Sequence, residues 1–240
     1  MAGYEIVPEG DSAMLLVFGD RISPEINTKV TAAADSLRER RIPGVTDLIP
    51  AYCSLLVQYD PLTISCESLR AQIGEILQES RNECEQSRRL IRIPVCYGGE
   101  YGPDLEHIAK NAGLTPETVI RIHSSRDYRV YMLGFLPGFC YLGGLDERIH
   151  TPRLKTPRLR IPAGSVGIGG SQTGIYPMDS PGGWQLMGRT PVRAYDPNRE
   201  EPILFRAGDI IRFVPVDVES YRRITWEIEQ GDWKNQWDSE

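Results

Sequence analysis

Three neighbouring stretches decide how this chain folds: GFLPGFCYLGGL at 134–145, PRLKTPRLRIPAGSVGIGGSQTGIYP at 152–177 and SPGGWQLMGRTP at 180–191. Twelve of the 23 glycines fall between residues 134 and 191. Glycine permits positive φ and a close approach of the backbone to a ligand, whereas proline fixes φ and removes a hydrogen-bond donor. The segment therefore forms turns and shaped loops, and the aromatic and basic side chains within it indicate a binding surface.

Short apolar runs, broken by glycine and proline, lie within this segment and on both sides of it. Runs of this kind are typical of strands in an antiparallel barrel or sandwich. The predicted strands are 128–133, 166–169, 185–187, 192–194, 203–205 and 210–214. We therefore expect a mainly-β C-terminal domain.

The N-terminal part of the chain alternates strands with helices. Ser23-Pro24-Glu25 is a typical helix start, because it combines a hydroxyl cap, a proline in the first turn and an acidic residue. The predicted elements are strands at 4–7, 13–18, 45–49 and 54–59 and helices at 24–42 and 65–80. This order predicts a small α+β sandwich with helices on one face of a sheet. The polar stretch 78–89 marks its end, which divides the chain into domains of residues 1–88 and 89–240.

Composition and charge restrict the classes of function. The formal net charge is −6 and the sequence pI is about 5.3, so the surface repels nucleic acid and anionic lipid. We expect no membrane span and no signal peptide, since no apolar run is long enough and the N-terminus is acidic. Five cysteines without a C-x-x-C motif are typical of reduced thiols in a cytoplasmic protein.

Several catalytic motifs are incomplete or absent. The three histidines are far apart and form no H-E-x-x-H motif, so we expect no metal site. The segment Ala163-Gly164-Ser165-Val166-Gly167 only partly resembles a nucleophile elbow, because its first residue is alanine and no helix follows. A P-loop is excluded, since Ile175 stands where the phosphate-binding lysine belongs.

A five-residue repeat supplies a cluster of cations. Thr151-Pro152-Arg153-Leu154-Lys155 is followed directly by Thr156-Pro157-Arg158-Leu159-Arg160. Proline favours extended backbone, in which alternate side chains share a face, so Arg158 and Arg160 are expected to point the same way. Such a pair suits a carboxylate or a phosphate, and the glycine amides at 164, 167, 169 and 170 suggest an anion-binding nest. The alternative is a solvated loop whose cations pair with the acidic surface.

These motifs resemble a known family. GFLPGFCYLGGL, PR-x-x-x-PR-x-x-IPAGSVGI, GIYP and SPGGWQLMGRTP are similar to the family of the bacterial 5-oxoprolinase B subunit, also called allophanate hydrolase subunit 1 or the KipI-type kinase inhibitors. The likeness extends over essentially the whole chain. It implies an N-terminal α+β domain followed by a cyclophilin-like β-barrel, in agreement with the organisation expected from the residues.

The resemblance also implies an activity that depends on partners. The chain would act as the B subunit of an ATP-dependent 5-oxoprolinase, inactive alone, which converts 5-oxo-L-proline to L-glutamate. It would pair directly with a related barrel protein, the C subunit, and work with the hydrolase-like A subunit. ATP with Mg²⁺ would be bound by the assembled complex. The residues themselves identify no catalytic group in this chain.

Side-chain chemistry and motif position suggest how a small acidic substrate is bound. Cations and hydrogen-bond donors aimed at oxygen atoms stabilise such a ligand and its charged intermediates. Three arginines are expected on the substrate carboxylate or a phosphate, two polar residues on the lactam, and two aromatic residues as walls against water. The arginines are Arg153, Arg158 and Arg160, and the polar residues are Ser165 and Gln172. The aromatic residues are Trp184 and Phe135.

The same resemblance allows a function of another class. A KipI-type protein binds a sensor histidine kinase and blocks its autophosphorylation, and the segment 135–139 would then contact the kinase. A prolyl isomerase is a weaker alternative, because a fold does not by itself imply an activity.

Overall fold

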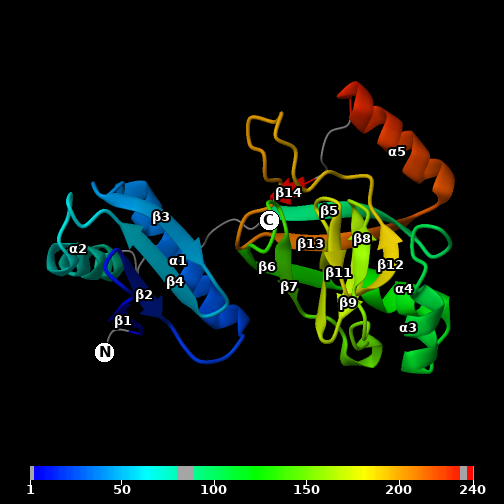
Figure 1. Cartoon of the computed structure of the whole chain (residues 1–240), viewed down its shortest axis with the longest axis horizontal. Coiled ribbons are helices and arrows are strands. Elements are labelled where there is room, and N and C mark those ends of the chain that lie inside the picture. Colours follow the sequence, from blue (N-terminus) through cyan, green and yellow to red (C-terminus); the bar gives the residue numbers. More distant parts are fainter. Residues whose placement is uncertain (1–2, 80–88, 233–236, 240) are drawn as a thin grey trace. The chain divides into compact units, whose positions relative to one another are not determined.

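The computed structural model describes residues 3–79, 89–232 and 237–239 (Figure 1). The chain divides into two compact units, Met1–Ser87 and Arg88–Glu240, each with a hydrophobic core of its own. In the described residues no helix is both long and apolar enough to cross a membrane.

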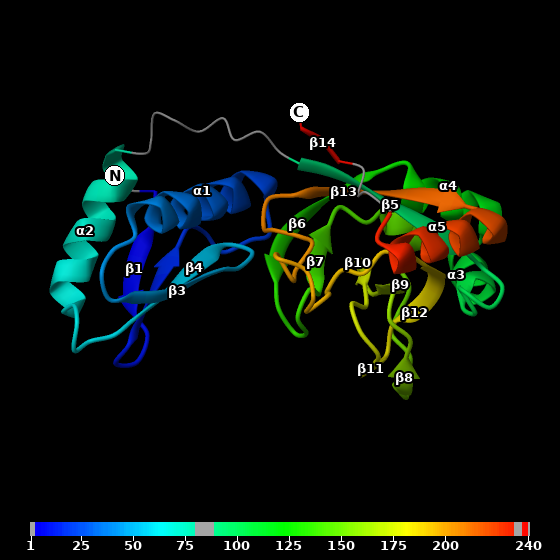
Figure 2. The same ribbon diagram turned by 90° about the horizontal axis from the view of Figure 1, so that it is seen from above.

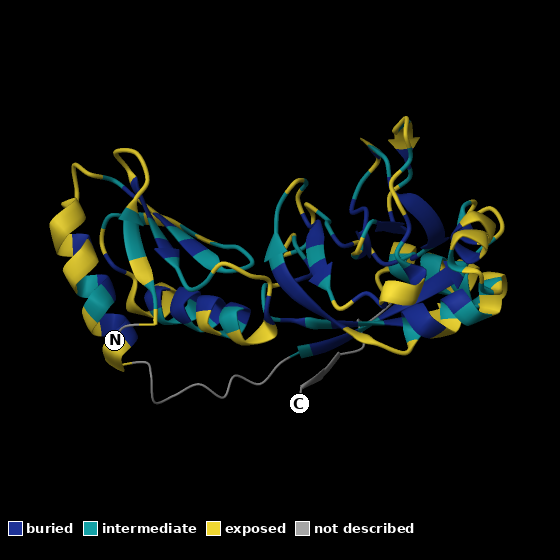
Figure 3. Ribbon diagram, turned by 90° about the horizontal axis from the view of Figure 1, so that it is seen from below, coloured by how far each residue is buried: buried dark blue, intermediate teal, exposed yellow. Residues whose placement is uncertain are grey.

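The first unit is a four-stranded antiparallel sheet with two helices. Its elements are β1 (Glu5–Pro8), β2 (Ala13–Val17), α1 (Pro24–Arg40), β3 (Val45–Pro50), β4 (Ser54–Tyr59) and α2 (Cys66–Glu79), and the strand order is β1-β2-β4-β3. Helix α1 begins as predicted, because the Ser23 hydroxyl accepts a hydrogen bond from the Ile26 amide at 3.3 Å. Alternate residues of β2 and β4 pack with one side of α1 and of α2 to form the core, while the other side of each helix is exposed (Figure 3).

The second unit contains a closed β-barrel. Its strands are β5 (Arg89–Tyr97), β6 (Asp127–Leu133), β7 (Cys140–Gly143), β9 (Ser165–Gly169), β10 (Gln172–Ile175), β12 (Gln185–Arg189) and β13 (Ile210–Val216). The order β12-β9-β10-β7-β6-β13-β5 closes through a further pairing of β12 with β5. All neighbouring strands are antiparallel except β5 and β13, which are parallel. The predicted barrel is therefore confirmed.

The remaining elements surround the barrel. They are α3 (Leu105–Ala112), α4 (Pro116–Ser124), a 3-10 helix (Glu147–Ile149), β8 (Arg158–Ile161), β11 (Ser180–Gly182), α5 (Val218–Gln230) and β14 (Trp237–Ser239). Strands β8 and β11 pair with each other and extend beyond the end of the barrel (Figure 2). Strand β14 pairs with the first residues of β5.

Two predicted strands are wrong. Residues 192–194 and 203–205 lie in irregular backbone joined only by an isolated bridge between Tyr195 and Ile203. Val192, Ala194, Leu204 and Phe205 are buried, which explains the strand-like pattern. Pro191, Pro197 and Pro202 interrupt the segment, and proline cannot donate a ladder hydrogen bond.

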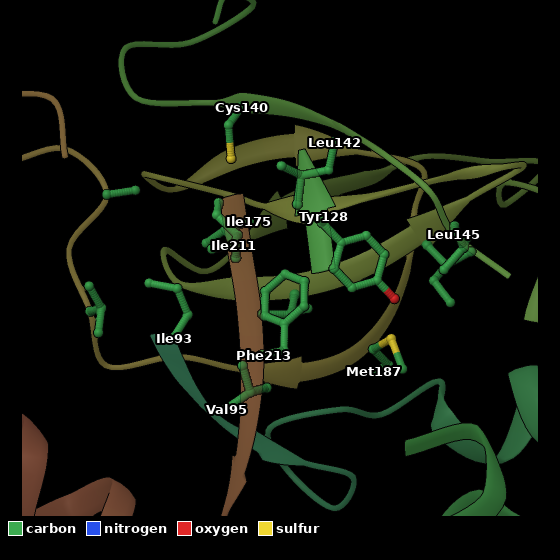
Figure 4. Close-up of a cluster of buried hydrophobic side chains, with 14 of the residues drawn as sticks. Ile93, Val95, Tyr128, Cys140, Leu142, Leu145, Ile175, Met187, Ile211 and Phe213 are labelled. Atoms are coloured by element: carbon green, nitrogen blue, oxygen red, sulfur yellow. The ribbon is translucent and has the colours of Figure 1, made fainter. Parts of the chain in front are cut away.

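A histidine lies in the barrel core beside large aromatic rings. Tyr128 and Phe213 fill the interior (Figure 4), and the His123 ring is stacked on Phe213 with 4.6 Å between ring centroids. The Thr173 hydroxyl donates to the Gly167 carbonyl, so it accepts from His123 Nε2 at 2.8 Å. His123 Nδ1 then accepts from the Tyr97 hydroxyl, also at 2.8 Å. Both ring nitrogens are satisfied in the neutral imidazole, and burial lowers the pKa of His123 to about 3.

One carboxylate connects α3, β12 and β8. The Asp104 amide donates to the Leu186 carbonyl at 2.9 Å, and Asp104 Oδ2 accepts from the Leu186 amide at 2.6 Å. Asp104 Oδ1 accepts from Arg158 Nη2 at 2.7 Å, while Arg158 Nη1 donates to the Trp184 carbonyl at 3.2 Å. The Asp104 and Arg158 side chains are 13% and 30% exposed, so water screens this ion pair only in part.

We predict that Asp104→Ala lowers the free energy of unfolding by about 2–4 kcal/mol, because it leaves a partly buried guanidinium and an amide without their partner. Arg158→Ala should cost about 1–3 kcal/mol, and the double variant should be less destabilised than the sum by at least about 1 kcal/mol. Urea unfolding of the four proteins measures this coupling. Arg160→Ala is the control, since Arg160 is 78% exposed in its ion pair, and it should cost under about 1 kcal/mol. Additive losses would contradict a shared Asp104–Arg158 interaction.

We also predict that His123 makes the fold sensitive to acid. The unfolded histidine binds a proton below about pH 6.5 and the folded one only near pH 3, so stability falls as the pH drops through this window. Between pH 7.5 and pH 5 the wild type should lose about 2 kcal/mol more than His123→Gln. Denaturant unfolding of both proteins at the two pH values measures this difference. His107 and His150 do not affect it, because the wild type and His123→Gln both carry them. Equal losses would mean that His123 takes up its proton in the folded state.

Candidate functional site

The face of the barrel sheet opposite the core is built to hold one tryptophan. In β9 and β10, Val166, Ile168 and Ile175 belong to the barrel core, and the residues between them face the other way. A Cβ at Gly169 would overlap the Trp184 ring, and one at Gly174 would lie 3.2 Å from it. The glycines of this segment therefore let an indole lie directly on the backbone of the sheet.

Trp184 is the centre of a small aromatic cluster. The Phe139 and Tyr176 rings meet it at centroid distances of 5.7 and 5.9 Å, in both cases edge to face. With Ile161 and Leu186 these residues form a second hydrophobic cluster. Burial raises the pKa of Tyr176, which keeps its hydroxyl neutral.

Arg153 lies over this cluster together with Gln172. Its guanidinium carbon is 5.9 Å from the centroid of the Trp184 ring, and its Nη2 donates to Gln172 Oε1 at 3.1 Å. The Leu154 amide donates to the Gly183 carbonyl at 2.7 Å and Gln185 Nε2 to the Pro152 carbonyl at 3.0 Å, so the backbone around Arg153 is held in place. Within the described residues no carboxylate lies within ion-pair distance of Arg153, and the side chain is exposed.

The two arginines of the second repeat copy are held by carboxylates. Arg158 is bound to Asp104, as described above, and is half-buried. Arg160 binds Asp179 through Nε at 2.8 Å and Nη2 at 2.6 Å. Hydrogen bonds from the Ala163 amide and from Arg160 lower the pKa of Asp179 and keep it charged. The structure thus gives Arg158 and Arg160 different partners, although the repeat suggested one shared ligand.

The expected nest of free glycine amides is wrong. The amides of Gly164 and Gly170 donate to the carbonyls of Tyr176 and Thr151, at 2.7 and 2.8 Å. Gly167 and Gly169 lie inside β9, which pairs with a strand on each side. The glycines serve close packing against Trp184 and leave no amide cradle for an anion.

The other two predicted residues lie apart from Arg153. Ser165 is fully buried at the start of β9, and its hydroxyl has no hydrogen-bond partner within the part of the chain that is described. Phe135 is 64% exposed, and its ring meets that of Phe139 at 5.4 Å between centroids. The predicted residues that the structure brings together are therefore Arg153, Gln172 and Trp184.

Sequence reasoning missed three residues that shape this site. Phe139 and Tyr176 stood in the quoted motifs, but a pattern of glycine and aromatic residues does not show which rings meet. Asp104 directly precedes α3, but its side chain makes no capping hydrogen bond to that helix. Its role is visible only in the structure, because Arg158 and Leu186 follow 54 and 82 residues later.

The site can bind and orient a ligand. An arginine over an indole, with an amide side chain beside it, suits a small planar molecule that carries a carboxylate or an amide. No group of three metal-ligating side chains occurs in the described chain.

Comparison with known proteins identifies the family. Residues 4–205 match the model of the "Carboxyltransferase domain, subdomain C and D". The chain is 49% identical to the B subunit of 5-oxoprolinase from Bacillus subtilis, covering 91% of this chain and 95% of that protein. It is 44% identical to the B subunit of 5-oxoprolinase from Escherichia coli O157:H7, covering 86% and 93%.

A solved structure agrees in sequence and in fold. The crystal structure of TTHA0988 matches with a TM-score of 0.77 and 40% identity. The match covers 85% of this chain, which spans 40% of the length of that one. Since the identity to the two curated relatives extends over nearly their whole length, this chain belongs to the family of the 5-oxoprolinase B subunit, within the carboxyltransferase domain, subdomain C and D family.

Proposed function

We propose that the chain is the B subunit of an ATP-dependent 5-oxoprolinase, which converts 5-oxo-L-proline to L-glutamate, and that it is inactive without the C and A subunits. The names of the two curated relatives support the activity, and the position of the Arg153 guanidinium over Trp184, with no carboxylate partner among the described residues, supports a small acidic ligand. This guanidinium is the observation on which the assignment of the site depends.

The side chains have distinct tasks in this proposal. Arg153 holds the carboxylate of 5-oxoproline, since it is the repeat arginine without a carboxylate partner among the described residues. Gln172 turns its amide from Arg153 to the lactam when substrate arrives. Trp184 is the apolar floor that keeps water from one face of the ring, and Arg158 acts as a positioning residue through the Trp184 carbonyl. Each of these interactions binds or orients and none cleaves the lactam, which is why the chain needs its partners.

Among the described residues, the carboxylates beside the repeat leave no open position for the Mg²⁺ that accompanies ATP. The carboxylates near the repeat, Asp104 and Asp179, are already hydrogen-bonded to arginines and backbone amides. No further acidic cluster suited to a divalent cation occurs in the described residues. We therefore assign ATP and Mg²⁺ to the assembled complex.

Reconstitution tests the proposal. The chain is mixed with the candidate A and C subunits, ATP, Mg²⁺ and 5-oxoproline, and glutamate release is measured with each protein omitted in turn. We expect release only from the complete mixture. Release that is unchanged when this chain is omitted would end the enzyme proposal.

In the complete mixture we predict that Arg153→Met lowers kcat/KM by about tenfold to a hundredfold, which corresponds to one lost charge-assisted hydrogen bond. Gln172→Leu should cause a smaller loss of kcat/KM, because the hydrogen bond that Gln172 makes to the lactam is between neutral groups. Lys155→Met removes an exposed cation two residues away and is the matched control, with activity close to wild type. Full activity of Arg153→Met, at wild-type stability, would remove Arg153 from the site.

A second candidate function is favoured by Phe135. This residue is exposed and has φ 66°, in a γ-turn closed by the Leu136 amide on the Gly134 carbonyl at 2.8 Å. Such turns are strained, and strained residues collect at functional sites. An exposed aromatic side chain in a strained turn suits contact with a protein, and inhibition of a sensor histidine kinase would use it.

We predict that Phe135→Gly keeps or slightly raises stability, because glycine adopts positive φ without strain, and abolishes any inhibition of kinase autophosphorylation. Leu62→Ala is the control, since Leu62 is 96% exposed in the other unit. The measurement is autophosphorylation of co-encoded sensor kinases with the chain at saturating concentration. Unaltered autophosphorylation with the wild-type chain would end this second candidate.

A further inference from the structure

Ser165 and Arg189 are neighbours on one face of the barrel sheet. They are directly opposite each other in the antiparallel pairing of β9 with β12. Side chains at opposite positions of an antiparallel pair lie on the same face with Cβ atoms about 5 Å apart. Residues 165, 167 and 169 alternate with core residues, so this is the face on which Trp184 lies.

Both side chains carry a buried polar atom without a partner. Ser165 is completely buried, and its Oγ makes no hydrogen bond among the described residues. Arg189 is half-buried, and its Nε atom is buried and also lacks a hydrogen-bond partner there. A buried polar group left without a hydrogen bond destabilises the folded state, and a charged group does so more strongly. The two orphaned atoms therefore indicate a missing hydrogen-bonding group between these strands.

Arg189 forms no ion pair among the described residues, although its charge helps to lower the pKa of the Asp179 carboxyl. Arg160 on the nearby β8, by contrast, is bound to Asp179. Arg189 lies over the Tyr101 ring, with 5.9 Å from the guanidinium carbon to the centroid. An aromatic face leaves the guanidinium edge available to an anion.

The turn before Ser165 is shaped to bring these groups together. Gly164 has φ 78°, and a Cβ there would overlap the Thr190 carbonyl and lie 3.4 Å from Cγ of Arg189. The Ala163 amide, which precedes this turn, is bound to Asp179. The turn thus places Gly164 directly against the Arg189 side chain, beside Ser165.

From these observations we propose that Ser165 and Arg189 form a binding site for an oxyanion, either a carboxylate or a phosphate group, which accepts hydrogen bonds from the Ser165 hydroxyl and the Arg189 guanidinium. The inference rests on the proposed function for its biological meaning, because it adds an anion position to the substrate-binding face. Ser165 is two residues from Gly167 and four from Gly169, the two glycines of β9 that lie against Trp184, so the oxyanion position is farther along this strand than the indole ring.

The test uses the full chain alone, titrated by calorimetry with inorganic phosphate and separately with acetate, at constant ionic strength set with chloride. We expect saturable 1:1 binding of at least one of the two, with a rise in the midpoint of thermal unfolding. Preference for phosphate or for acetate identifies the class of ligand. No binding of either anion would overturn the proposal and leave an ordered water as the partner of these groups.

Variants locate the site. Ser165→Ala and Arg189→Met should each weaken binding by about tenfold or more, and Arg189→Lys should restore only part of it. Ser165→Ala removes a buried unsatisfied hydroxyl and should keep the fold, so the test does not depend on Arg189→Met folding. Arg206→Met, which removes an exposed arginine paired with Glu201, is the charge-matched control. Equal binding by wild type and Ser165→Ala would also overturn the assignment.

The outcome is separable from that of the proposed function. Anion binding is measured without the A and C subunits, ATP or 5-oxoproline, whereas the reconstitution measures glutamate release. A chain that is needed for release but binds neither anion would lose only the Ser165–Arg189 site. A chain that binds phosphate but is dispensable for release would keep this site and lose the proposed function.

Discussion

The carboxylate of Asp104 is the interaction on which the proposed ligand-binding face depends. It holds the start of α3, the middle of β12 and the β8 strand in one set of hydrogen bonds. Through Arg158 it also reaches the Trp184 carbonyl, and Trp184 is the floor under Arg153. An acidic residue from one helix thus supports a cationic site that is formed by loops far away in the sequence. Without it, Trp184 would lose the charge-assisted hydrogen bond at its carbonyl, which is more directional than the apolar packing of its ring.

The second unit has two hydrophobic clusters on opposite faces of the same strands. The larger one fills the barrel and contains the neutral His123, whereas the smaller one surrounds Trp184 and carries polar residues at its edge. The larger cluster therefore stabilises the barrel, and the smaller one shapes the face to which we propose that the ligand binds. The barrel supplies a closed sheet without long free edges, and the outer cluster supplies an apolar floor with a cation above it. Rigid strands below a ligand-binding face keep its side chains in place before a ligand arrives.

Local signals predicted much of the fold. The Ser23 cap, the alternating strands of the first unit and the glycine-broken strands of the barrel follow from spacing and turn chemistry. The strands predicted at 192–194 and 203–205 are wrong, because buried apolar runs look alike whether or not they form a ladder. Of the site, the sequence predicted Arg153, Gln172 and Trp184 by chemical type. It could not show that Arg158 is bound by Asp104, since pairings between distant residues follow from tertiary structure. For the same reason Arg189 was overlooked, although it lies in a quoted motif.

The contact between Trp184 and the glycines of β9 and β10 has a consequence for how this family varies. No side chain fits at Gly169 while the indole is in place, because a single methyl group would already occupy the position of the ring. A smaller residue at 184 would in turn leave a void over bare backbone, with the loss of packing that voids bring. A substitution at either position alone therefore lowers the stability of the fold. Related chains should differ at both positions or at neither.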